Sequence, residues 1–128
     1  MSDKKITILI AEDEEDLRQM YTMAIKSRGF EVLEAKNGEE ALEWLEKNVD
    51  NIDLILLDIV MPEMDGFEAL EKIKKDERFR KIPVLVSTNL DNDEDRKEAL
   101  SMGAKDYFVK SLHTPSELVN EIQKVLSI

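Results

Sequence analysis

Short runs of apolar residues, many of them β-branched, alternate with longer amphipathic stretches along the whole chain. The predicted strands and helices are, in chain order, 5–11, 14–29, 31–35, 38–48, 53–57, 66–77, 83–87, 93–103, 106–110 and 115–126. Strict strand–helix alternation favours a parallel sheet whose right-handed crossover helices cover both faces. The apolar run in DLILL (53–57) is typical of a strand that is covered on both sides. The sequence therefore predicts one α/β domain over residues 1–128.

Charge and composition exclude several classes of function. The formal net charge is -11, whereas binding to nucleic acid or to an anionic membrane surface needs clustered Lys and Arg. The chain has no cysteine, which excludes disulfides and thiolate metal sites. Its longest early apolar run, ITILIA (6–11), is too short for a membrane span or a signal peptide. We therefore expect a cytoplasmic protein with no direct contact to nucleic acid or membrane.

Polar side chains stand where the predicted strands end. These residues are Glu12, Asp13, Asp58, Ser87, Thr88 and Lys110. In open α/β sheets, ligands bind outside the carboxyl ends of the strands, so we expect these side chains to gather at one edge. Each has an ordinary explanation alone, as an acid at a helix start, a turn hydroxyl or a surface lysine. Those explanations leave the coincidence at one edge unaccounted for.

Gathered carboxylates repel one another, so either a pKa rises or a divalent cation neutralises them. With oxygen ligands only, Mg²⁺ is the natural ion. A carboxylate beside Mg²⁺ can attack a phosphoryl group and form an acyl phosphate. The metal, a lysine and a hydroxyl can then share the charge on the phosphoryl oxygens.

Four segments together resemble the receiver domain of two-component response regulators. They are ILIAEDEEDLR (8–18), LILLDIVMPEMDGFE (54–68), PVLVSTN (83–89) and GAKDYFVK (103–110). Their order and spacing match the family over essentially the whole chain. The resemblance implies a flavodoxin-like doubly wound (βα)5 fold with strand order 2-1-3-4-5.

The resemblance also implies a metal site. Asp58 would be the phospho-acceptor, with Asp13 as a direct Mg²⁺ ligand and Glu12 as a ligand through water. Val60 would offer its backbone carbonyl to the same ion. Glu12 replaces the commoner Asp, which the family tolerates.

The remaining implied roles concern the switch and the partners. Thr88 would be the switch hydroxyl, Tyr107 the switch aromatic and Lys110 the phosphate-binding lysine. A sensor histidine kinase or phosphotransfer protein would donate the phosphoryl group, and the surface over residues 91–126 would then favour a downstream protein target. Such a domain is not an enzyme beyond promoting its own phosphorylation and dephosphorylation.

Some positions depart from the family. Ser111 follows Lys110 where proline is usual, often after a cis bond; a non-proline cis bond costs about 3–4 kcal/mol, so the geometry there is open. Asn89 replaces a small residue beside the expected phosphate. Val60 and Leu90, at positions that tune hydrolysis in the family, are both apolar, and we expect a long-lived phosphoryl state.

Other protein classes share parts of this pattern. Glu121 stands near the place where winged-helix regulators carry a basic dimer residue, and no chain remains for an output domain, so we expect a stand-alone receiver. It would be a monomer that docks on a target or relays phosphate, with dimerisation on phosphorylation left open. A dehalogenase-type phosphatase needs a second Asp where Val60 stands, and EDEED (12–16) would repel a flavin phosphate. The main remaining alternative is a receiver-like interaction module that acts without phosphorylation. His113, the only histidine, is expected to be a surface residue.

Overall fold

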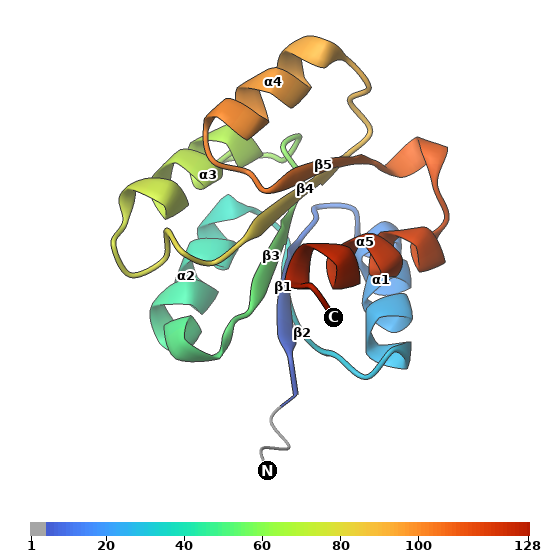
Figure 1. Cartoon of the computed structure of the whole chain (residues 1–128). Helices are drawn as coiled ribbons and strands as arrows, with labels where there is room; N and C mark the ends of the chain where they lie inside the picture. Colours follow the sequence, from blue (N-terminus) through green and yellow to red (C-terminus); the bar gives the residue numbers. More distant parts are fainter. Residues whose placement is uncertain (1–4) are drawn as a thin grey trace.

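The computed structural model describes residues 5–128 and contains one five-stranded sheet in that range. The strands are β1 (Thr7–Ala11), β2 (Glu31–Ala35), β3 (Leu54–Leu57), β4 (Val84–Thr88) and β5 (Asp106–Val109). Neighbouring strands pair in parallel, in the order β2-β1-β3-β4-β5 (Figure 1). The predicted fold class and strand order are confirmed.

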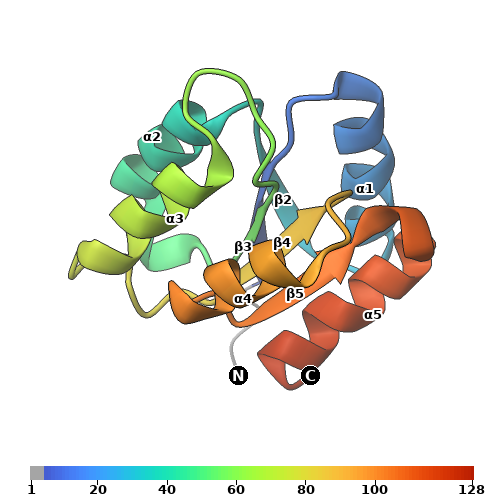
Figure 2. The same ribbon diagram turned by 90° about the horizontal axis from the view of Figure 1, so that it is seen from above.

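Helices cover both faces of this sheet (Figure 2). Helices α1 (Glu15–Ser27) and α5 (Pro115–Leu126) lie on one face. Helices α2 (Gly38–Asn48), α3 (Gly66–Lys75) and α4 (Asp93–Ser101) lie on the other, with α4 next to β5. Two short 3-10 helices, η1 (Val49–Asn51) and η2 (Lys110–Leu112), follow α2 and β5. Within residues 5–128, none of the helices combines the length and apolar character needed to cross a bilayer.

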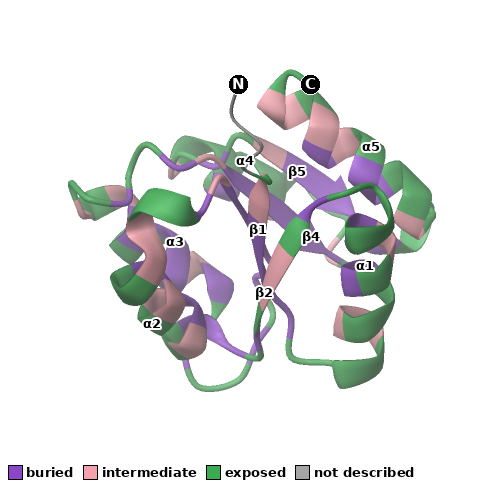
Figure 3. Cartoon of the chain, turned by 90° about the horizontal axis from the view of Figure 1, so that it is seen from below, coloured by how far each residue is buried: buried purple, intermediate pink, exposed green. Residues whose placement is uncertain are grey.

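The core consists of two apolar layers, one on each face of the sheet. Every residue of β3 and β4 is buried, as their apolar sequences predict for central strands. Figure 3 shows buried segments gathered in the middle of the molecule and exposed ones on the outer sides of the helices. Since successive side chains of a strand point to opposite faces, Leu85 packs toward α1 and α5, whereas Val84 and Val86 pack toward α2 and α3. The edge strand β2 is only partly covered. The central strands are thus held rigidly from both sides.

The structure shifts several predicted ends. Helix α1 begins at Glu15 and ends at Ser27, inside the predicted 14–29, and α3 ends at Lys75, because the Asp76 carboxylate accepts the Arg78 N–H and turns the chain. Strand β4 extends to Thr88, whose pairing with Val109 continues the ladder. Lys110 begins a 3-10 helix instead of ending β5. Every predicted strand and helix is present, and only the residues at which they begin and end differ from the prediction.

Candidate functional site

Four strands end at the same edge of the sheet and place polar side chains around one cavity. Figure 2 shows the loops that leave β1 and β3 side by side at this edge. The cavity has a volume of about 230 Å³. The residues that line it are Glu12, Asp13, Glu14, Leu17, Asp58, Val60, Thr88, Asn89, Leu90 and Lys110. The structure therefore brings together all the residues predicted at the strand ends except Ser87, which lies outside this cavity.

Lys110 lies between two buried carboxylates. Its Nζ donates to Asp58 Oδ2 at 2.9 Å and to Glu12 Oε1. All three residues are at most 7% exposed. Burial alone lowers the pKa of the Lys110 ammonium, but the Asp58 charge and the Glu12 hydrogen bond outweigh it, so this pKa is raised overall. Lys110 is therefore a fixed positive charge beside Asp58.

The same environment also raises the pKa of the Glu12 carboxyl, which favours its neutral form, whereas the raised pKa of Lys110 favours its charged form. Burial raises the Glu12 pKa, and the hydrogen bond and charge of Lys110 oppose that rise without cancelling it. Glu12 Oε2 also accepts the Glu14 N–H at 3.0 Å, and Asp58 Oδ1 accepts the Val60 N–H at 3.0 Å. One oxygen of each carboxylate thus binds Lys110, and the other is oriented by the backbone of its own loop.

The loop from β3 to α3 sets the position of Asp58. Gly66 packs so closely on this loop that a Cβ there would lie 2.2 Å from the Asp58 carbonyl oxygen. Its N–H donates to Ile59 O at 3.1 Å, and Asp65 caps α3 by accepting the Glu68 N–H at 2.9 Å. Glu63, at the loop tip, adopts a left-handed conformation with φ 66°, which is uncommon outside glycine. The MDG segment (64–66) therefore packs closely against the loop that carries Asp58 and holds it in place.

Three carboxylates form a candidate metal centre. One oxygen each of Glu12, Asp13 and Asp58 lies within 4.8 Å of the others, and Asp13 is the exposed member. Opposite ligands of an octahedral Mg²⁺ ion are about 4.2 Å apart, since each Mg–O bond is about 2.1 Å. The cluster offers the oxygen ligands that Mg²⁺ prefers, and the exposed Asp13 side leaves room for the waters that Mg²⁺ retains. The predicted backbone ligand, Val60, lines the same cavity and is 54% exposed.

Thr88 and Tyr107 are linked through Leu90. Thr88 Oγ1 accepts the Leu90 N–H at 3.3 Å, and the Tyr107 hydroxyl donates to Leu90 O at 2.7 Å. The Tyr107 side chain is buried, and burial raises the pKa of its phenol. The Tyr107 side chain is thus held inward, and the backbone of Leu90 connects it to Thr88.

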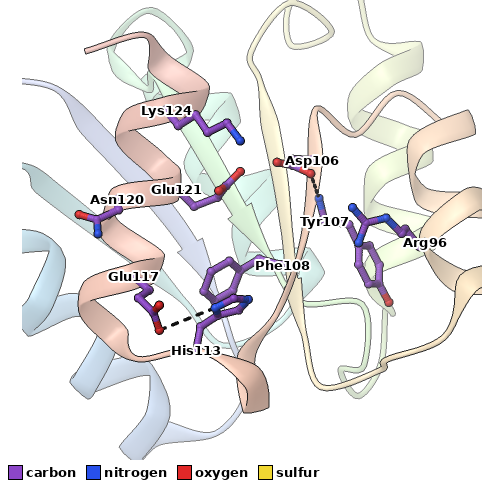
Figure 4. Close-up of a pocket in the computed structure, with 9 residues that line it drawn as sticks. All are labelled: Arg96, Asp106, Tyr107, Phe108, His113, Glu117, Asn120, Glu121 and Lys124. Atoms are coloured by element: carbon purple, nitrogen blue, oxygen red, sulfur yellow. Dashed lines mark hydrogen bonds and ion pairs between the residues drawn. The ribbon is translucent and has the colours of Figure 1, made fainter.

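A second pocket, of about 440 Å³, lies between β5 and α5 (Figure 4). Asp106 and Glu121 face each other across it. Glu121 Oε2 is buried without a donor, because an ionised Asp106 can only accept. A proton on Glu121 satisfies both groups, and this hydrogen bond raises the Glu121 pKa; it also lowers the Asp106 pKa despite burial. Asp106 Oδ1 further accepts the Tyr107 N–H at 2.8 Å.

Other features complete the description of the predicted residues. The Lys110–Ser111 bond is trans, as are the other peptide bonds of residues 5–128. His113 is on the surface, as predicted; its ring lies 4.7 Å from that of Phe108, and Nδ1 lies 3.7 Å from Glu117 Oε1. Asn89 is exposed at the cavity rim and does not close it.

Sequence reasoning missed the supporting residues. Arg18 donates to the Glu12 carbonyl at 2.9 Å and to Glu34 Oε1 at 3.1 Å, which ties the acidic loop to β2. The only sequence signal for this role is an arginine one turn into the helix that follows the acids. The close approach of Gly66 is hinted at by the DG pair, but the pattern alone does not show what it touches.

The sequence matches the model of the response regulator receiver domain over residues 8–123. The transcriptional regulatory protein SrrA of Staphylococcus aureus is 35% identical over 119 residues, which cover 93% of this chain and 47% of SrrA. The chain spans about half the length of the curated relatives that it matches.

Solved structures agree with the sequence match. The crystal structure of the Vibrio cholerae chemotaxis protein CheY4 has a TM-score of 0.87 at 30% identity and covers 94% of this chain and 98% of that one. The CheX–CheY–BeF3–Mg²⁺ complex of Borrelia burgdorferi has a TM-score of 0.86 at 29% identity and covers 94% and 88% of the two chains. With strand order and acidic cluster in agreement, the chain belongs to the response regulator receiver domain family of two-component signalling.

Proposed function

We propose that this receiver accepts a phosphoryl group on Asp58 from a sensor histidine kinase or phosphotransfer protein, in a reaction that requires Mg²⁺. The observation that carries the proposal is the bridge from Lys110 to Asp58 and Glu12 at the floor of an open cavity. A buried ion triad of this kind is weak evidence for stability, because desolvation offsets its attraction. Its place beside a cavity argues for a chemical role.

The residues present suit phosphoryl transfer. Asp58 supplies the attacking oxygen, and Val60 N–H and Lys110 orient its carboxylate. The phosphorus–nitrogen bond of the donor phosphohistidine breaks as the new bond to Asp58 forms, and the imidazole leaves with the electron pair. Lys110 and the Thr88 hydroxyl would hold the phosphoryl oxygens. Bound Mg²⁺, held by Glu12, Asp13, Asp58 and the Val60 carbonyl, would neutralise charge on the same oxygens.

The output of the switch follows from the Leu90 link. If Thr88 turns toward the phosphoryl group, its hydrogen bond to Leu90 N–H is lost. Leu90 also accepts from Tyr107, which lies on β5 beside Asp106 and the pocket of Figure 4. Phosphorylation would therefore alter the surface of α4, β5 and α5, where we place the docking of a downstream protein.

The second candidate is a receiver-like module that binds its partner without phosphorylation. The Leu90 link favours it in one respect, because Tyr107 is buried without a phosphoryl group. Against it stand the complete set of acidic, hydroxyl and lysine side chains around the cavity. A cluster that serves only structure would be more stable if it were apolar.

The test is intact mass spectrometry after incubation with acetyl phosphate and Mg²⁺. The expected result is a gain of one phosphoryl group, about 80 Da, which is absent in Asp58→Asn and with EDTA. An exposed control, Asp91→Asn, should gain the group as the parent protein does. If the parent protein gains nothing, the phosphorylation-independent module replaces this proposal.

A further inference from the structure

Ser87 is the strand-end hydroxyl that the proposed reaction leaves without a role. It precedes Thr88 in β4, so its side chain points to the opposite face of the sheet, toward α1 and α5. On that face the neighbouring core residues are apolar, among them Leu85 and Phe108. Ser87 is 2% exposed, and its Oγ has no hydrogen-bond partner among the described residues. A buried unpaired hydroxyl is rare and calls for an explanation.

The explanation lies in the gap that Ser87 shares with Lys110. This gap is also lined by Glu12, Asp58 and Tyr21, and it leaves no room for a water molecule. In the structure Ser87 Oγ makes no hydrogen bond to any of these groups, Lys110 included, so only a small shift within the gap can give it a partner. Glu12 and Asp58 already accept from Lys110.

Lys110 is short of one partner in the same place. Its ammonium carries three N–H donors, and the two carboxylates take two of them. A buried ammonium with an unused donor carries a desolvation cost, just as the Ser87 hydroxyl does. The unused N–H of Lys110 is a donor and the unpaired Ser87 oxygen can accept, and both residues line the same narrow gap.

We propose that Ser87 is a positioning residue for Lys110: a small shift of Nζ within the shared gap lets the Ser87 hydroxyl accept the third ammonium proton, on the α1–α5 side of the sheet. A neutral acceptor in a central strand does not move when the carboxylates change partners. Lys110 can then leave Asp58 Oδ2 or Glu12 for a phosphoryl oxygen while one of its hydrogen bonds stays fixed. This consequence rests on the proposed function, whereas the hydrogen bond itself does not.

Tyr21 is the competing acceptor. Its ring is buried in the same gap, and burial raises the pKa of its phenol while the nearby Lys110 charge lowers it. Ser87 is favoured because its oxygen is fully buried and unpaired, whereas the Tyr21 hydroxyl is not among the buried unpaired atoms of the described residues.

The test measures proton exchange at Lys110 Nζ by ¹H–¹⁵N NMR in the metal-free, unphosphorylated protein, with Lys110→Arg used to assign the signal. Ser87→Ala should speed exchange of the ammonium protons about fivefold, the effect of one neutral hydrogen bond. Tyr21→Phe should leave the rate unchanged. Thr22→Val, which removes another buried unpaired hydroxyl outside the gap, should also leave it unchanged.

Three results would overturn the proposal: an unchanged rate in Ser87→Ala, a faster rate in Tyr21→Phe instead, or a parent protein whose Lys110 signal exchanges too fast to observe. A second arm compares phosphorylation rates with acetyl phosphate, and Ser87→Ala should be about fivefold slower than Thr22→Val. If the parent protein accepts no phosphoryl group, the proposed function fails, and the NMR result still decides the role of Ser87.

Discussion

At the carboxyl edge of the sheet, Lys110 lies between Asp58 and Glu12, whereas between β5 and α5 the carboxyl groups of Asp106 and Glu121 meet with no cation between them. Among residues 5–128, no Lys or Arg makes an ion pair with either Asp106 or Glu121. The first group is buried and fixed by ion pairs, whereas the second is half-buried, and the hydrogen bond between its two carboxyl groups raises the pKa of Glu121 and lowers that of Asp106. Clustered acids thus occur here in two settings: one in which a buried lysine fixes both carboxylates, and one in which the two carboxyl groups contact each other directly.

The largest difference should appear when each lysine is removed. Lys110→Met leaves two buried carboxylates without their cation, and we expect a loss of about 3 kcal/mol in the free energy of unfolding. Lys124→Met, beside the second pocket, should change it by less than about 0.5 kcal/mol. Urea denaturation of both variants measures this. Equal losses of unfolding free energy in the two variants would show that the two clusters depend on their lysines to the same degree.

The MDG segment of the first region should be nearly as sensitive. Gly66→Ala places a Cβ against the Asp58 carbonyl, so the loop has to move, at a cost of about 2–3 kcal/mol. The exposed neighbour Glu68→Ala should stay within about 0.5 kcal/mol of the parent protein. Denaturant unfolding of the pair is the measurement. A fully stable Gly66→Ala protein would mean that the loop is not closely packed.

The apolar rim of the first region should slow loss of the phosphoryl group. Val60 and Leu90 line the cavity, and their side chains offer no polar atom to orient an attacking water. We expect Val60→Asn combined with Leu90→Glu to shorten the phosphoryl half-life about tenfold, equivalent to about 1.4 kcal/mol in the barrier. Following the loss of phosphorylated mass with time after removal of the donor measures this. A parent half-life of seconds that the double variant leaves unaltered counts against the idea.

Tyr107 joins the two regions, because its hydroxyl binds Leu90 and its amide binds Asp106. Tyr107→Phe removes one hydrogen bond and should cost about 1 kcal/mol of unfolding free energy. In amide NMR spectra, phosphorylation of this variant should shift residues 106–121 less than in the parent protein. Undiminished shifts would mean that the signal reaches α5 by another path.

The smallest effect concerns the second region alone. The raised pKa of Glu121 means that this group favours folding at low pH, and that this contribution is lost as pH rises through its folded pKa. Glu121→Gln donates an N–H to Asp106 at every pH. We expect it to be more stable by about 0.5 kcal/mol at neutral pH, after allowing for solvent screening, and to match the parent protein below about pH 4. Thermal melts at both pH values test this, and a stabilisation that persists in acid would contradict the shared proton.

The sequence predicted the architecture because the alternation of apolar runs depends on near-neighbour spacing alone. It also predicted which side chains gather, since Asp58 and Lys110 end strands that parallel pairing brings to one edge. Their functional roles stay predictions. The inward position of Tyr107 depends on its bond to Leu90 O, a contact between residues 17 apart that no periodicity encodes.

The features that the sequence did not predict depend on contacts between residues that are far apart in the chain. Arg18 reaches Glu34 across 16 residues, and Ser87 in β4 shares a gap with Tyr21 in α1. In the linear pattern, Ser87 and Thr88 are equivalent strand-end hydroxyls. Successive side chains of a strand point to opposite faces of the sheet. In β4, Thr88 therefore lies at the cavity, whereas Ser87 lies in the gap beside Lys110.

The most direct test of the central claim is to locate the phosphoryl group on the chain. Borohydride reduces an aspartyl phosphate to homoserine, which tandem mass spectrometry of the peptides identifies by position. After phosphorylation with acetyl phosphate and Mg²⁺, we predict homoserine at position 58 and intact aspartate or glutamate at 12, 13 and 91. Homoserine at another position, with Asp58 unmodified, would contradict the assignment of Asp58 as the acceptor.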